Sequence, residues 1–124
     1  MTATSLREET SLVYRFDADA DGAFWLVRQL VEQFLRERHV RSDAIPDLLL
    51  VTTELCTGAV AGVVLRVFVE DYDVDIVVES CGGVVLDRPQ GDLRLAASMC
   101  DEVIVRVTPE QTVVRARRHG VVLL

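Results

Sequence analysis

The stretch TELCTGAV, from Thr53 to Val60, places a single carboxylate in a largely apolar segment. Apolar and small residues recur there at three- and four-residue spacing, which predicts a helix with one buried stripe: Ile45, Leu48, Leu49, Thr52, Leu55, Cys56 and Ala59. The sequence RSD at 41–43 supplies a start signal, Pro46 is tolerated in the first turn, and we expect the helix to end around Gly62. Glu54 and Gly58 are four residues apart, so they share one helical face.

Upstream of this helix, the sequence predicts one strand and one amphipathic helix. Leu12, Tyr14 and Phe16 alternate with outward-facing positions, as in a half-buried strand. From Asp21 onward, the apolar positions follow the period of a helix: Val27, Leu30, Val31 and Phe34. We expect the adjacent Phe24 and Trp25 to be mainly core residues, with the alternative that one of them stays exposed as an interface anchor.

Downstream, the pattern changes to two hairpins separated by a short helix. Two β-branched runs at 65–70 and 74–79 flank the turn DYD, and a second pair at 103–108 and 112–118 flanks PEQ. Between them, residues 81–91 read as a loop and residues 92–102 as a helix, with Leu93, Ala96, Ala97 and Cys100 on one face. The order βααββαββ predicts an α+β two-layer sandwich, with helices on one face of a mixed or antiparallel sheet.

Length and charge limit the classes of function. The 124 residues suit a single domain at 11–124, preceded by a flexible N-terminus at 1–10. A formal net charge of −7 argues against binding to nucleic acid or to anionic membranes, and favours a basic protein partner. All thirteen basic residues are arginine, which excludes a catalytic lysine or a phosphate-loop lysine.

The sequence carries no targeting or metal-binding signal that we recognise. MTATSLREET has no apolar core and no apolar run approaches the roughly 20 residues of a membrane span, so we predict a cytoplasmic protein. Cys56, Cys81 and Cys100 show no C-x-x-C spacing, so neither a disulfide framework nor a zinc site is predicted. His39 and His119 have no acid or cysteine at ligand spacing, and we assign no metal site.

Two segments of the sequence are rich in charged residues, and we assign a ligand to neither. The carboxylates of EDYDVDI lack the glycine and the terminal glutamate of a calcium loop, so a charged hairpin turn explains them. The cluster RARRH at 115–119, with Arg106 on the neighbouring strand, is interpreted as a solvated strand face or as a contact to an acidic partner.

The order of elements and two local segments resemble a known family. TELCTGAV and DLRLAASMCDEV are similar to SELVTNAV and GLRLVAALADEV in the Bergerat-fold (histidine-kinase-like, GHKL) ATPases. The closest resemblance is to their small anti-sigma factors, which are also serine kinases, and it extends from Leu12 to His119. The fold implied by this resemblance is a Bergerat-type ATPase sandwich.

The resemblance implies roles for the helix motif. In the family, the glutamate acts as a general base or orients the attacking group, and an asparagine four residues later binds the Mg²⁺ that bridges the ATP phosphates. Glu54 matches the glutamate, whereas Gly58 stands at the asparagine position and has no side chain to bind a metal. The alternative for Glu54 is a solvated carboxylate on the helix face.

The other two nucleotide motifs are degenerate. Where the family has D-x-G-x-G against adenine, this sequence has ESCGG, so either Glu79 or Ser80 replaces the aspartate beside Gly82 and Gly83. A plain turn is the alternative. Where the family has G-x-G-L-x-L, this sequence has QGDLRL, so Gly91 is flanked by Gln90 and by Asp92, which is expected to cap the helix. The lid between these motifs shrinks to VVLDRP.

The resemblance and the degenerate motifs together predict a regulatory binding protein. We expect an anti-sigma factor that sequesters a sigma factor, is released by an anti-sigma factor antagonist, can form a homodimer, and has lost its ATP cofactor and kinase activity. One alternative is an active serine/threonine kinase that uses ATP with magnesium and Glu54 as base. A second alternative is a pseudokinase whose partner is not a sigma factor.

Overall fold

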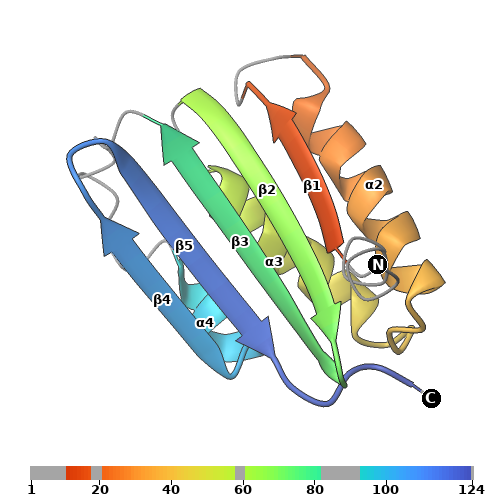
Figure 1. Ribbon diagram of the computed structural model, residues 1–124. Coiled ribbons are helices and arrows are strands. Elements are labelled where there is room, and N and C mark those ends of the chain that lie inside the picture. The colour runs from red at the N-terminus through yellow and green to blue at the C-terminus, as the bar shows by residue number, and fades with distance from the viewer. Residues whose placement is uncertain (1–10, 18–20, 58–60, 82–92, 124) are drawn as a thin grey trace, which may run out of the picture.

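The computed structural model describes residues 11–17, 21–57, 61–81 and 93–123. The helices and strands follow one another in the predicted order βααββαββ (Figure 1). The elements are β1 (Ser11–Phe16), α2 (Ala23–Glu37), α3 (Ile45–Thr57), β2 (Ala61–Glu70), β3 (Asp73–Cys81), α4 (Arg94–Met99), β4 (Glu102–Val107) and β5 (Gln111–Arg118).

The five strands form one sheet in the order β1-β2-β3-β5-β4, and every neighbouring pair is antiparallel. The helices α2, α3 and α4 lie together on one face of the sheet, and no described helix covers the other face (Figure 1). The predicted α+β two-layer sandwich is therefore confirmed, and the sheet is antiparallel rather than mixed. None of the described helices combines the length and apolarity needed to cross a membrane.

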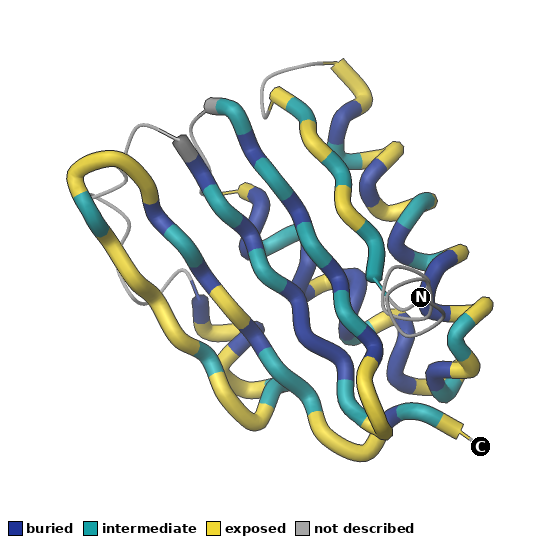
Figure 2. Tube along the Cα trace, in the orientation of Figure 1, coloured by how far each residue is buried: buried dark blue, intermediate teal, exposed yellow. Residues whose placement is uncertain are grey.

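Strand alternation divides each strand between the two faces of the sheet (Figure 2). On β1, Leu12, Tyr14 and Phe16 pack against the core as predicted. On β2 and β3, the alternate residues that face the helices are buried: Val63, Leu65, Val67, Val69, Val74, Ile76 and Val78. The opposite face of these two strands carries half-buried and charged side chains instead.

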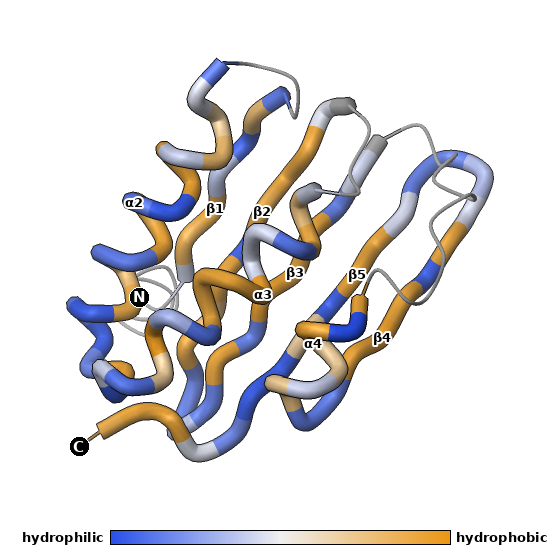
Figure 3. Tube along the Cα trace, turned by 180° about the vertical axis from the view of Figure 1, so that it is seen from behind, coloured by the Kyte–Doolittle hydropathy of each residue, from blue (hydrophilic) through white to orange (hydrophobic). Residues whose placement is uncertain are grey.

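The central helix α3 is buried on most of its circumference, because α2, α4 and the sheet all contact it. Every described member of its predicted stripe is buried, while Ala59 lies outside the described residues. Thr52 is tolerated there because its hydroxyl donates to the Leu48 carbonyl at 2.8 Å. From behind, the apolar side of the helices faces the apolar side of the sheet (Figure 3).

The prediction that the second helix reaches Gly62 is wrong, since α3 is described only to Thr57 and β2 begins at Ala61. Gly62 has a positive φ of 59°, and the β2–β3 register shifts between Ala61 and Val63. A glycine in a left-handed conformation at a register shift is typical of a β-bulge, so this glycine marks an irregular strand start and not a helix end.

The short helix is also smaller than predicted. It spans Arg94–Met99, and the chain becomes extended at Cys100 before β4 starts at Glu102. Ala96 is buried as expected and Cys100 is half-buried, but Ala97 is exposed, so the predicted face is wrong at that position.

Candidate functional site

Glu54 lies in the last turn of α3 and its carboxylate reaches the first turn of α4. Its Oε1 accepts a hydrogen bond from the backbone N–H of Ala96 at 2.7 Å, and its Oε2 accepts one from the N–H of Leu95 at 3.1 Å. The N-cap residue of α4, Leu93, provides no side-chain cap. Glu54 therefore caps α4 from a different helix.

This contact has a clear physical basis. The first N–H groups of a helix have no partner within the helix, and the N-terminal end carries a partial positive charge that favours an anion. A half-buried carboxylate needs donors of this kind. Both carboxylate oxygens of Glu54 thus receive a donor, and the two helices are held together at this end of the helix layer.

Sequence reasoning did not foresee that Leu95 and Ala96 would bind Glu54. We predicted Asp92 as the cap of this helix, and Asp92 lies outside the described residues. The available signal was the isolation of Glu54 in an apolar helix, because a carboxylate in such a segment requires hydrogen-bond donors from elsewhere in the fold. The role of Glu54 as a base stays a prediction.

The two candidate replacements for the adenine-binding aspartate lie on opposite faces of β3. Glu79 is on the face without helices, where its Oε2 accepts a hydrogen bond from Arg66 Nε of β2 at 3.1 Å. Ser80 is on the helix side of the sheet and is 4% exposed. Only Ser80 therefore shares a side of the sheet with Glu54. The other candidate positions, Gly58, Gly82, Gly83, Gly91 and Asp92, lie outside the described residues, as does the segment VVLDRP.

A charge network occupies the face of the sheet that the helices leave uncovered. Asp75, only 7% exposed, accepts two hydrogen bonds from Arg115, at 3.1 Å and 3.0 Å. Arg117 lies 3.7 Å from Asp75 and 3.5 Å from Asp73. The hydrogen bond that Arg115 donates to Asp75 raises the pKa of Arg115 further above its ordinary value. Carboxylates and guanidinium groups from adjacent strands thus neutralise one another.

Both charged segments of the sequence, EDYDVDI and RARRH, contribute residues to this network. The backbone N–H of Gly120 and the side chain of His119 bind Asp73, and the N–H of Gly120 is the main cause of the lowered pKa of that carboxyl. Arg118 pairs instead with Asp47 of α3 at 3.2 Å. The cluster at 115–119 is therefore paired largely within the chain. Among the described residues, no group of three histidine, cysteine or acidic side chains is placed to hold a metal ion.

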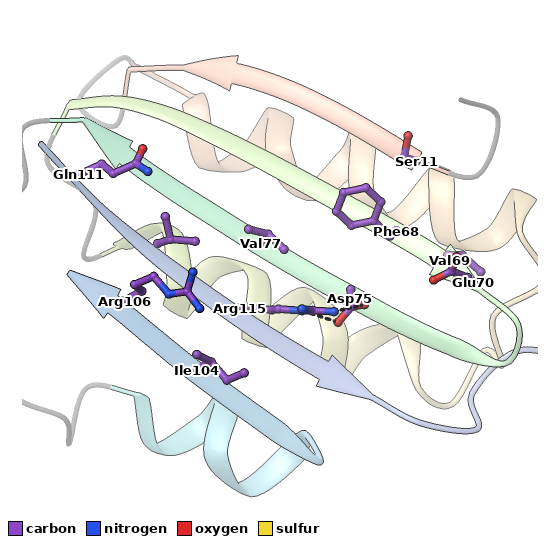
Figure 4. A pocket seen from close by; sticks show the side chains of 11 residues that line it. Ser11, Phe68, Val69, Glu70, Asp75, Val77, Ile104, Arg106, Gln111 and Arg115 are labelled. Atoms are coloured by element: carbon purple, nitrogen blue, oxygen red, sulfur yellow. Dashed lines mark hydrogen bonds and ion pairs between the residues drawn. The ribbon is translucent and has the colours of Figure 1, made fainter. Parts of the chain in front are cut away.

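A shallow hollow of about 740 Å³ lies on the same uncovered face (Figure 4). Its lining includes the apolar side chains of Phe68, Val77 and Val113. Arg115 crosses the hollow to reach Asp75. Ile104 and Arg106 of β4 form one side of the hollow. The hollow is on the opposite side of the sheet from Glu54, so it is separate from the helix motif.

Two further side chains have unusual environments. Burial is the main cause that raises the pKa of the Cys100 thiol to about 11, and the nearby Glu54 and Asp101 add to the effect. On α2, Phe24 packs edge-on against Phe16, with ring centroids 6.4 Å apart, whereas Trp25 is 67% exposed. Of the two aromatic residues, Trp25 is therefore the exposed one.

The comparison with solved structures identifies the fold. The chain matches a crystal structure of the RsbU and RsbW domains of Rv1364c from Mycobacterium tuberculosis, with a TM-score of 0.74 and 19% sequence identity. The chain shares its α+β fold with that structure. The match covers 92% of this chain and 34% of the RsbU–RsbW chain, so this chain spans about a third of that protein's length. No family model and no curated protein matches the sequence.

Proposed function

We propose that this chain is an anti-sigma-type regulatory protein that acts by protein–protein binding and has lost ATP binding and kinase activity. The observation that carries the proposal is the pair of hydrogen bonds from Leu95 and Ala96 to Glu54. In the GHKL ATPases, which this sequence resembles, the glutamate acts in catalysis and the short helix begins at the phosphate-binding motif. Here, the glutamate is already used to cap that helix.

The charge of Glu54 also disfavours an anion at the start of α4. A phosphate group bound at the start of α4 would need the N–H groups that Glu54 occupies, and it would lie against a carboxylate of the same sign. Both carboxylate oxygens of Glu54 are also directed at α4, so the side chain would have to leave these two donors before it could contact a substrate. The absence of a metal-binding side chain at Gly58 supports the same proposal.

The proposed partners are a sigma factor and an anti-sigma factor antagonist. The resemblance places the sigma-binding surface around the first strand and the helices, and the fold shared with the RsbU–RsbW structure supports a role in partner switching. Trp25 offers a suitable anchor there, since exposed aromatic side chains are enriched at energetically important interface positions.

The first experiment is a calorimetric titration of the purified protein with ATP and magnesium. We expect no binding heat with the wild-type protein. Micromolar binding that disappears in Glu54→Ala would contradict the proposal and would support the alternative of an active kinase with Glu54 as base. Glu37→Ala is the matched control, because it removes an exposed glutamate from the end of a different helix.

The second experiment tests the partner. The protein is co-expressed with each sigma factor and each antagonist of its source organism, and we expect one of them to co-purify in a stoichiometric complex. If no sigma factor or antagonist binds, the anti-sigma assignment is wrong and the pseudokinase alternative, with a different partner, replaces it.

A further inference from the structure

The hollow on the uncovered face of the sheet is lined by more apolar side chains than a solvated sheet surface requires (Figure 4). In an antiparallel sheet with one packed face, the outward positions of the strands are usually polar. On β3, however, Val77 stands between Asp75 and Glu79 in the outward positions, and Val113 lines the same hollow from β5. Ile104 of β4 is 46% exposed there. No described helix covers these apolar side chains.

The lining of the hollow also contains one cation and one anion that the described residues do not neutralise. Arg106 of β4 and Glu70 of β2 both line the hollow, and both are exposed. Neither side chain forms an ion pair or a hydrogen bond with another described residue. Arg115 and Asp75, which lie between them, are instead paired with each other (Figure 4).

The strand register places these two charges at opposite ends of the hollow. Glu70 pairs with Asp73, whereas Arg106 pairs with Val113, which in turn pairs with Glu79. Asp73 and Glu79 are six positions apart on β3, which corresponds to about 20 Å along the strand. Three inter-strand spacings from β2 to β4 add about 14 Å across the sheet, so the two charges are about 25 Å apart.

The backbone of the sheet limits the kind of segment that can cover this face. The strands β2, β3 and β5 are each paired on both sides, so their N–H and C=O groups are used within the sheet. A segment on this face must therefore satisfy its own backbone groups, which a helix does internally. Three helices cover the opposite face in this way, and a helix in the hollow would add a third layer (Figure 1).

We propose that the hollow binds an amphipathic helix of a partner protein. The apolar stripe of this helix packs on Val77, Val113 and Ile104, an acidic side chain near one end pairs with Arg106, and a basic side chain near the other end pairs with Glu70. At a rise of 1.5 Å per residue, charged positions about 25 Å apart are separated by about 16 residues of a helix. This partner is additional to the one proposed for the surface around Trp25, because α2 lies on the other side of the sheet.

The first test uses three synthetic peptides of about 18 residues with the same leucine stripe on a helical pattern. One carries glutamate near one end and lysine near the other, the second carries glutamate at both ends, and the third carries lysine at both ends. We expect the mixed-charge peptide to bind the full chain most tightly by isothermal calorimetry, and each companion to bind about tenfold more weakly, because it places like charges together at one end of the hollow.

This ranking separates the hollow from general electrostatic attraction. The net charge of −7 by itself would favour the double-lysine peptide. The comparison also holds for either direction of the helix, since all three peptides can bind in both directions. Equal affinity for the three peptides would overturn the proposal, and so would an absence of binding heat with the mixed-charge peptide at about 1 mM.

The second test reverses the charges on the protein. Arg106→Glu should make the double-lysine peptide the tightest ligand, and Glu70→Lys should do the same for the double-glutamate peptide. Arg94→Glu is the matched control, because it reverses an exposed arginine of α4 in the helix layer and should leave the ranking unchanged. Circular dichroism verifies that each variant is folded. If both hollow variants keep the wild-type ranking, the charges of the hollow do not select the helix and the proposal is wrong.

The third test examines the apolar contact and the location of the peptide. Ile104→Ala should weaken binding of the mixed-charge peptide by about fivefold. Val13→Ala is its control, because Val13 is 47% exposed on β1 but does not line the hollow. Trp25 is the only tryptophan of the sequence, and its fluorescence should not change when the peptide binds. A fluorescence change that follows binding would locate the peptide on the helix layer and contradict the proposal. None of these results depends on the proposed function, since the hollow uses neither Glu54 nor α2.

Discussion

At the scale of single residues, Glu54 is the side chain that connects the sequence motif with the structure. Its two carboxylate oxygens accept hydrogen bonds from consecutive N–H groups of α4, so this side chain caps the N-terminus of a helix that is distant in the sequence. The sequence identified Glu54 as the residue to examine. It did not identify the donors, because they lie about forty positions downstream in the chain.

We expect Glu54→Ala to lower the free energy of unfolding by about 1–2 kcal/mol, because it leaves two N–H groups of α4 without an acceptor. Glu54→Gln retains one acceptor oxygen and should cost less. Urea denaturation measures both effects. The control Glu37→Ala, at an exposed position, should stay within about 0.5 kcal/mol of wild type. An Ala variant as stable as wild type would show that the cap is not energetically important.

The thiol of Cys100 provides a pH-dependent prediction. Because burial raises its pKa to about 11, the neutral thiol persists through neutral pH, and the reactive thiolate appears only as the pH rises toward that value. We expect iodoacetamide to alkylate Cys100 at pH 8 far more slowly in the folded protein than in guanidinium, as measured by peptide mass spectrometry. Equal rates in the two conditions would contradict the assigned environment.

At the scale of elements, hairpins were the most predictable feature and irregular junctions the least. Period-two alternation in β2 to β5 is a local property, so both hairpins follow from the sequence alone. The junction between α3 and β2 was placed wrongly, because a glycine suits both a helix end and a bulge. Only pairing with β3 decides which of these Gly62 forms.

The pairing of β3 with β5 is also stabilised by the ion pair between Asp75 and Arg115. We expect Asp75→Ala to destabilise the protein by about 2 kcal/mol or more, since it leaves Arg115 and Arg117 without their shared carboxylate. Thermal and urea unfolding provide the measurement. Glu110→Ala, in the exposed turn between β4 and β5, is the control and should have little effect.

A double-mutant cycle separates the interaction energy between Asp75 and Arg115 from the contribution that each side chain makes by itself. The cost of Asp75→Ala combined with Arg115→Ala should be smaller than the sum of the two single costs, because the second substitution removes a charge that the first left unpaired. Additive costs would mean that the two groups do not stabilise one another despite the short distances between them.

At the scale of the whole molecule, the helix layer and the uncovered sheet face present two different surfaces. The helix layer exposes Trp25, whereas the uncovered face carries the Asp75 network and the hollow beside Ile104. The anti-sigma partner is expected at the first strand and the helices, which is the surface that exposes Trp25.

We expect Trp25→Ala to weaken the complex with the sigma factor or antagonist by about 2 kcal/mol, or about thirtyfold in dissociation constant. The Trp25→Ala variant should be as stable as the wild-type protein, because the Trp25 side chain is 67% exposed. Tyr72→Ala removes a comparably exposed aromatic side chain from the β2–β3 turn and should leave the affinity unchanged. Isothermal calorimetry measures both variants, and equal effects would refute the helix surface as the binding site.

The sequence by itself determined the order of the elements, the apolar faces of the strands and the position of Glu54 on the second helix. Each of these depends on a repeat of two to four residues, which neighbouring positions reveal directly. Only the tertiary structure decided the strand order, the burial of Asp75 and the capping of α4 by Glu54. These features join residues that are thirty or more positions apart, and no local pattern specifies which distant groups will satisfy one another's charge and hydrogen bonds.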